Sequence, residues 1–189
     1  MAGITDSVKV FIAEAGRQQA VLFAACCVER AAGILFWAVS RQNRIGDLDV
    51  YSRTLEYIWM AGRVLDGAEV LASHDIEQMR ELSVGDEATG IAASALYGAI
   101  AMRSALLYLE TGNTEWAVDC SSVLERHAFL LGRRSSDPLV ESEYTEQIAD
   151  IEELAAHGVT FEDLSRNLRE RARRVGRIRL EIAIRAYAG

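Results

Sequence analysis

The chain has 189 residues, 50% of them hydrophobic and 25% charged, a composition typical of one globular domain. Its formal net charge of −8 and its isoelectric point near 5.0 oppose the long-range attraction on which nucleic-acid binding depends, so we expect no nucleic-acid partner. A single proline and scattered glycines leave no linker or low-complexity tract. We therefore predict a single domain over residues 1–189.

Apolar residues recur at spacings of three and four, which indicates helices throughout the chain and no strands. The fold class that we predict is all-α: a single-domain, irregular helical bundle of about seven or eight helices with a mostly apolar central helix. The predicted helices cover residues 6–15, 18–40, 49–65, 75–82, 87–110, 114–132, 138–157 and 160–187.

Particular residues set these boundaries. Gly46 and Asp47 interrupt the second periodic segment, and Asp49 can cap the third helix. Asp137 precedes Pro138, which is well placed at the first helical position because it has no N–H to satisfy there. Thr160, with Asp163 three residues later, resembles a capping box and starts the last helix. Residues 87–110 are apolar nearly all round, so we place that helix at the centre.

Two apolar stretches, Ala20–Val39 and Ile91–Leu109, approach the length that crosses a bilayer. The first has Glu29 and Arg30 at its middle and the second contains Arg103, so we predict core helices and no membrane partner. The three cysteines form an odd set, with adjacent Cys26 and Cys27 held apart by a helical backbone, and we expect buried, reduced thiols. The N-terminus lacks a basic, apolar secretory signal, which favours a cytoplasmic location.

Several segments, spread in order along the chain, carry a family resemblance. They are Phe23-Ala24-Ala25-Cys26-Cys27-Val28-Glu29-Arg30, Gly46-Asp47, Tyr51-Ser52-Arg53-Thr54-Leu55-Glu56-Tyr57-Ile58-Trp59 and Asp137-Pro138-Leu139-Val140-Glu141-Ser142-Glu143-Tyr144. Together they resemble the YjaG-like family of bacterial proteins, domain of unknown function 416. The resemblance implies an all-helical fold and supplies no established activity.

The adjacent charges of Glu29 and Arg30 lie in an apolar segment, where each charge must be paired to be tolerated. Neighbours on a helix point about 100° apart, so each should have a different partner, and Arg53 and Glu56 of the third helix are candidates. Two interpretations stay open: a polar network that fixes helix packing, or a functional pocket. The candidate residues are Glu29, Arg30, Tyr51, Arg53 and Glu56.

Catalytic and metal motifs are missing from the sequence. Histidines 74, 127 and 157 lie in separate segments without metal-ligand spacing, and no nucleophile elbow, phosphate loop or dinucleotide fingerprint occurs. The acidic cluster Glu141, Glu143 and Glu146 fits a helix N-terminus, where the helix dipole favours negative charge. We therefore expect no metal, no cofactor and no catalytic residue.

Charge is distributed unevenly, because residues 161–189 hold eight arginines and four acids, which leaves about −12 on the other 160 residues. A negative body can steer a basic partner, so we predict a non-enzymatic interaction domain. The sharpest form of this prediction is an immunity or antitoxin-type protein that neutralises a basic toxin. The candidate acidic interaction patch consists of Asp66, Glu69, Asp75, Glu77, Glu81, Asp86 and Glu87.

The sequence leaves two further interpretations open. The alternative function is a small-molecule-binding helical protein or an uncharacterised enzyme with a pocket around the Glu29-Arg30 pair. A homo-oligomer is also possible, with a seam of apolar side chains from the last helix such as Leu180, Ile182 and Ile184.

Overall fold

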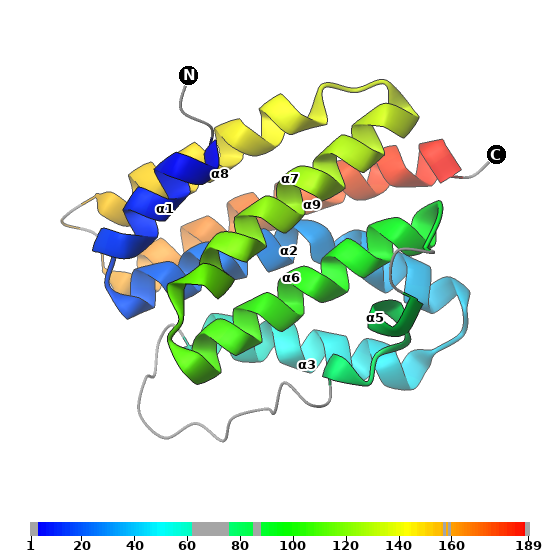
Figure 1. Cartoon of the computed structure of the whole chain (residues 1–189), viewed down its shortest axis with the longest axis horizontal. Coiled ribbons are helices and arrows are strands. Elements are labelled where there is room, and N and C mark those ends of the chain that lie inside the picture. Colours follow the sequence, from blue (N-terminus) through cyan, green and yellow to red (C-terminus); the bar gives the residue numbers. More distant parts are fainter. Residues whose placement is uncertain (1–3, 62–75, 85–87, 157, 159, 188–189) are drawn as a thin grey trace.

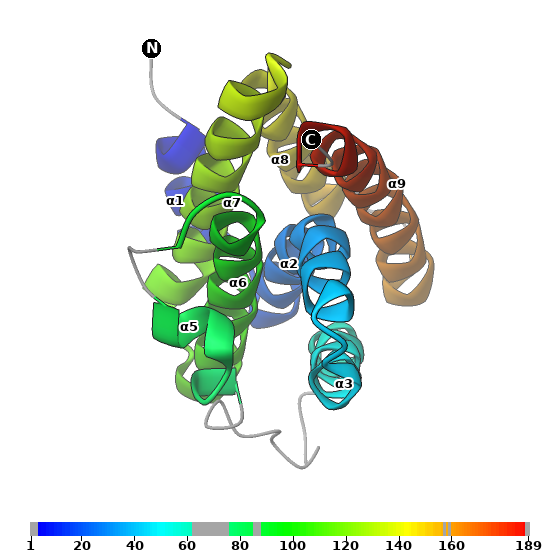
Figure 2. The ribbon, with the colours of Figure 1, turned by 90° about the vertical axis from the view of Figure 1, so that its right-hand side faces the viewer.

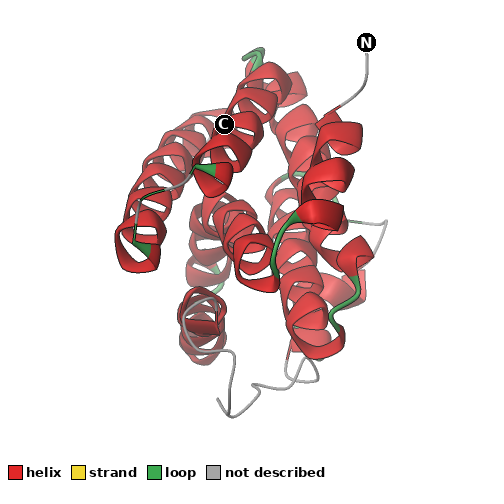
Figure 3. Cartoon of the chain, turned by 90° about the vertical axis from the view of Figure 1, so that its left-hand side faces the viewer, coloured by secondary structure: helices red, strands yellow, loops and turns green. Residues whose placement is uncertain are grey.

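A computed structural model describes residues 4–61, 76–84, 88–156, 158 and 160–187. The described part of the chain contains eight helices and no strand, which confirms the predicted all-α fold (Figures 1 and 3). The helices are α1 (Ile4–Glu14), α2 (Arg17–Arg41), α3 (Ile45–Ala61), α5 (Arg80–Val84), α6 (Ile91–Thr111), α7 (Thr114–Ser135), α8 (Leu139–Ala155) and α9 (Phe161–Tyr187).

Helix α2 occupies the centre of the bundle. Figure 2 shows α2 surrounded by α3, α6, α7, α8 and α9, and every residue from Ala20 to Ala32 is buried. We expected the helix over 87–110 to be the most central, but α6 packs against one side of α2 and has 61% of its most apolar window buried, against 83% for α2. Both helices are long and apolar enough to cross a membrane by length and composition.

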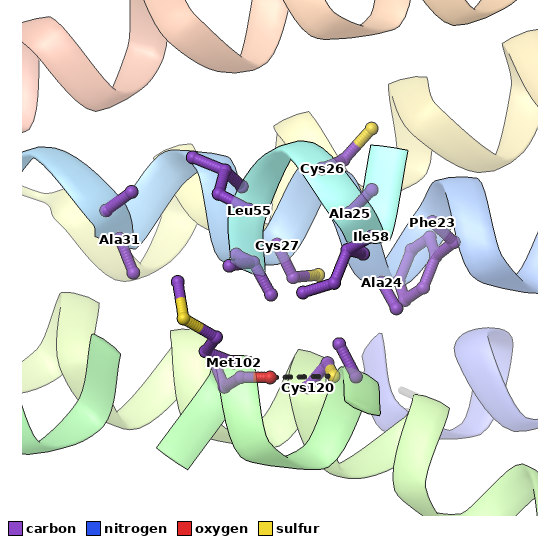
Figure 4. Close-up of a cluster of buried hydrophobic side chains, with 14 of the residues drawn as sticks. Phe23, Ala24, Ala25, Cys26, Cys27, Ala31, Leu55, Ile58, Met102 and Cys120 are labelled. Atoms are coloured by element: carbon purple, nitrogen blue, oxygen red, sulfur yellow. Dashed lines mark hydrogen bonds between the residues drawn. The ribbon is translucent and has the colours of Figure 1, made fainter. Parts of the chain in front are cut away.

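The core around α2 combines small and sulfur-containing side chains with larger apolar ones such as Phe23, Leu55 and Ile58. Figure 4 shows Cys26 and Cys27 pointing to different sides of the helix, with Met102 and Cys120 close to the Cys27 side. All three cysteines are buried and free, as predicted, and the Cys120 thiol donates to the Ala101 carbonyl at 3.5 Å. Burial raises the pKa of the Cys120 thiol well above its usual value, so it stays protonated.

The start of α3 and the end of α7 differ from the prediction, because local interactions outweigh the tendency of Asp49 to cap a helix and of Gly132 to end one. Helix α3 begins at Ile45 rather than at Asp49. Asp47 lies in its first turn, where its carboxylate pairs with Arg44 and is stabilised by the positive end of the helix dipole. Helix α7 passes Gly132 and ends at Ser135. Its end is closed at Ser136, which has a positive φ of 64° and donates its N–H to a carbonyl one turn back.

The remaining ends lie close to the predictions. Helix α9 starts as expected, since the Thr160 hydroxyl accepts the Asp163 N–H at 3.2 Å and donates to the Asp163 carboxylate at 2.8 Å. Helix α6 starts after Gly90, and helix α8 ends at Ala155. The predicted ends at residues 65, 75, 87 and 157 fall outside the described residues.

Helix α9 approaches the backbone of α2 closely at Gly176. A Cβ at this position would lie 3.0 Å from the Glu29 carbonyl oxygen and 3.3 Å from that of Arg30. Both obstacles are backbone atoms of the central helix and cannot rotate away. The close approach is what brings the arginines of α9 within reach of α2 and α8.

We expect Gly176→Ala to lower the free energy of unfolding by about 1–3 kcal/mol, because the added methyl group pushes α9 away from α2. Gly46→Ala is the matched control: a Cβ at Gly46 meets nothing within 4 Å, so this variant should be neutral or slightly more stable. Urea unfolding of both variants measures the difference, and equal stability of the two would contradict the close approach.

Candidate functional site

Arg30 of α2 is fully enclosed, with 1% of the side chain exposed, and forms ion pairs with two carboxylates of α8. Its Nη1 donates to Asp150 at 2.5 Å and its Nη2 to Glu143 at 3.1 Å. Both carboxylates are 0% exposed. Arg30 therefore supplies the charge that allows two acids of α8 to face the core.

Two arginines of α9 complete this cluster. Arg171 Nη2 lies 2.6 Å from the second oxygen of Asp150, and Arg179 pairs with the second oxygen of Glu143. We call Arg30, Glu143, Asp150, Arg171 and Arg179 the buried ion network. Since each carboxylate bridges one arginine of α2 and one of α9, the network connects three helices.

A neutral side chain extends the buried ion network to α7. The amide of Gln147 donates to Glu143 at 2.8 Å and to the Ser121 carbonyl at 3.3 Å, and the Ser121 hydroxyl donates to Gln147 at 2.6 Å. Burial opposes ionisation of Glu143, yet the Arg179 and Arg30 charges and the Gln147 bond outweigh it and lower its pKa. Glu143 is therefore ionised and closed to solvent, which suits a structural role.

We predict that Arg30→Met lowers the free energy of unfolding by about 3–5 kcal/mol, because the buried carboxylates of Glu143 and Asp150 would each lose one of their two arginine partners. Arg103→Met is the control, since Arg103 is 37% exposed and pairs with Glu77 at the surface, a contact expected to contribute less than about 1 kcal/mol. Chemical denaturation checks both variants. If Arg30→Met lowered the free energy of unfolding no more than Arg103→Met does, the structural role assigned to Arg30 would be contradicted.

His127 of α7 is buried next to this network, and neither ring nitrogen has a hydrogen bond to a described residue. Its ring stacks on Tyr97, with centroids 6.3 Å apart and planes at 28°. Burial and the Arg179 charge lower the pKa of His127 to about 4, although Glu143 acts in the opposite direction. His127 is therefore neutral at neutral pH.

The lowered pKa of His127 predicts a pH dependence of stability. The unfolded imidazole takes up a proton near pH 6.5 and the folded one near pH 4, so between these values the unfolded state binds more protons. Stability should fall by about 3 kcal/mol as the pH drops across this window. His127→Phe, which keeps a ring against Tyr97, should abolish this loss.

Below pH 4.5 both proteins should lose stability, because the unfolded Glu143 side chain binds a proton before the folded one, whose pKa is lowered. Urea unfolding at a series of pH values measures both effects. Equal slopes for wild type and His127→Phe between pH 6.5 and 4 would show that His127 is not the group responsible.

Glu29 faces away from the buried ion network, as expected for the neighbour of Arg30 on a helix. The indole N–H of Trp59 donates to one Glu29 oxygen at 2.6 Å, and Arg173 Nε donates to the other at 3.0 Å. Arg169 lies 3.4 Å from the same carboxylate. Glu29 is 8% exposed, so α3 and α9 together cover it.

The partners that we predicted from α3 are wrong for both Glu29 and Arg30. Arg53 is 64% exposed and pairs with Asp49 on the outer face of α3. Glu56 pairs with Arg169 and Arg173, the same two arginines that contact Glu29. The acids that pair with Arg30 come instead from α8, far away in sequence.

The residues that contact Glu29 also line a cleft between α3 and α9, which has a volume of about 340 Å³. The Arg169 guanidinium is 5.5 Å from the centre of the Trp59 ring, so the arginine lies against the aromatic wall. We call this feature the α3–α9 cleft. Its lining consists of Glu56, Trp59, Met60, Glu162, Ser165, Arg166, Arg169, Glu170 and Arg173.

The three arginines of the α3–α9 cleft are already ion-paired. Arg166 pairs with Asp163, and the other two pair with Glu29 and Glu56 as described above. Two acids at the rim, Glu162 and Glu170, have no ion pair to any residue that the structure describes. The uncompensated charge of the cleft is therefore negative.

Tyr51 lies outside the α3–α9 cleft. Its hydroxyl donates to Glu81 at 2.5 Å, and Arg44 also pairs with Glu81, which joins α3 to α5. Burial and the bond to Glu81 raise the pKa of Tyr51. The predicted pocket around Glu29, Arg30, Tyr51 and Arg53 is therefore not one site, since these side chains lie in four different places and contact different partners.

The predicted acidic patch is only partly visible. Asp66, Glu69, Asp75, Asp86 and Glu87 lie outside the described residues. Glu81 is 6% exposed, so it does not belong to an exposed patch, because Arg44 and Tyr51 hold it inside. Glu77 is 44% exposed and pairs with Arg103.

Within residues 4–61, 76–84, 88–156, 158 and 160–187, no group of three or more His, Cys, Asp or Glu side chains is arranged to hold a metal ion. No protein-family model, no curated protein and no solved structure matches the chain. The YjaG-like resemblance therefore stays a prediction.

Proposed function

We propose that the protein is a non-enzymatic interaction domain that binds a basic partner protein at the α3–α9 cleft. The observation that carries this proposal is the pair of uncompensated carboxylates, Glu162 and Glu170, at the rim of a cleft walled by Trp59. A lysine or arginine of the partner would enter between them. The overall charge of −8 supports the same choice, because it accelerates encounter with a basic protein.

The composition of the cleft supports a protein ligand. Tryptophan, arginine and methionine are enriched at the centres of protein interfaces, and all three line this cleft. Met60 is 58% exposed beside it and has a flexible side chain that adapts to a partner. The sharpest form of the proposal is an immunity or antitoxin-type protein whose partner is a basic toxin.

A non-enzymatic role is supported by the directions of the pKa shifts. Acid–base catalysts have pKa values moved toward neutral pH. Here burial raises the pKa of Cys26 and Cys120, and burial lowers that of His127. The Arg169 hydrogen bond lowers the pKa of Glu56 in the cleft itself. All these groups are moved away from the range that catalysis uses.

The test uses a fluorescent hexa-arginine peptide as the basic probe and measures its binding by anisotropy. The variant Glu162→Gln/Glu170→Gln should weaken binding about 3–10-fold, the effect expected for two exposed ion pairs. Wild-type binding should weaken as salt is added, because exposed charges are screened.

The control is Glu14→Gln/Glu115→Gln, which removes the same charge from exposed positions of α1 and α7. Like the test pair, it includes one glutamate in the first turn of a helix, so effects on the helix dipole are matched. Equal weakening by both variants would mean that the peptide senses only net charge, and would overturn the cleft as the binding site.

A further inference from the structure

The outer side of α9 carries charge of the opposite sign to the rest of the chain. Five of its eight arginines, at 166, 169, 171, 173 and 179, have carboxylate partners within the fold. The other three, at 174, 177 and 185, are exposed and have no ion pair to a described residue. Two apolar side chains of α9 are also exposed, Ile178 at 52% and Ile184 at 38%.

This surface differs from the apolar seam that the sequence suggested. Ile182 is only 7% exposed, and Leu180 is half-buried against the cluster that contains Ile34. Neither is free to form a seam with a second molecule. The exposed surface of α9 instead carries a line of two arginines with one isoleucine between them.

Arg174, Ile178 and Arg185 form that line. They are spaced by four and then seven residues, which on a helix places them within about 40° of one another and about 6 and 10 Å apart along the axis. All three are exposed. The order along α9 is therefore cation, isoleucine, cation, and the exposed Glu181 lies about 60° to one side of Ile178.

Helix α8 carries the complementary line on its exposed side. Glu152, Ile148 and Glu141, followed from the C-terminal to the N-terminal end of α8, are also spaced by four and then seven residues. All three are exposed, and neither glutamate has an ion pair among the described residues. The order is anion, isoleucine, anion, in the opposite chain direction.

We propose that these two lines bind each other between two copies of the chain, so that the protein forms a homodimer. In an antiparallel pairing, Glu152 meets Arg174, Ile148 meets Ile178 and Glu141 meets Arg185. A two-fold axis makes this contact twice, since α8 of each copy receives α9 of the other. Isoleucines flanked by opposite charges are the pattern that sets partner and orientation when helices pair.

A nucleic acid or an anionic membrane is less suited to this face. Glu181 lies among the exposed residues of α9 and would repel phosphates, and the chain as a whole is strongly negative. The exposed Ile178 finds an apolar partner, Ile148, on α8 of another copy but none on a phosphate backbone. The matching spacing of α8 favours a second copy specifically.

Sedimentation equilibrium of the full chain tests this proposal. We expect twice the chain mass of 20.8 kDa, and a shift toward monomer between about 0.1 M and about 1 M salt. Two charge-reversed variants, Arg174→Glu/Arg185→Glu and Glu141→Arg/Glu152→Arg, should each be monomeric, because like charges then face each other in both contacts.

The decisive arm is the mixture of the two variants. Each contact of a mixed dimer pairs opposite charges again, so mixing should restore the dimer mass, whereas loss of folding could not produce that rescue. Glu14→Arg/Glu115→Arg is the control and should remain dimeric. A monomeric wild type, variants that stay dimeric, or a mixture that stays monomeric would overturn the proposal.

Discussion

The ion pairs of Arg30 with Glu143 and Asp150 are the interaction on which the arrangement of the outer helices depends. A guanidinium in the middle of the central helix is costly unless carboxylates reach it, and those carboxylates in turn need a second cation each. Helix α8 provides the acids and helix α9 the cations. The absence of a side chain at Gly176 lets α9 come close enough to do so. Charge matching thus specifies which faces of α8 and α9 point inward.

The neighbouring Glu29 shows how one dipeptide serves two purposes. Because adjacent helical side chains point in different directions, Arg30 enters the closed network while Glu29 reaches toward α3 and the α3–α9 cleft. The carboxylates of the network, Glu143 and Asp150, are closed to solvent, whereas the rim of the cleft keeps two carboxylates without an ion pair among the described residues. We therefore assign stability to the first and propose partner binding for the second.

Helix existence could be predicted from the sequence because the apolar period and the caps at Thr160 and Gly112 act locally. The ion partners could not, because periodicity does not say which helix packs on which. Glu143 was interpreted as an acid at a helix N-terminus. A usable signal was present: Glu143, Gln147 and Asp150 continue the stripe of Leu139 and Leu154, so they face the core. The same logic would have placed Arg179 inside, since it follows Leu168 and Val175 on α9.

The most direct test of this account is native-state hydrogen exchange of the wild-type chain, followed residue by residue. If the buried ion network joins α2, α8 and α9, the amides around Arg30, Asp150 and Arg179 should exchange only through one shared opening, with the same free energy. Exchange of the α8 and α9 amides at a much lower free energy than those of α2 would contradict it, because the outer helices would then detach while the core stays folded.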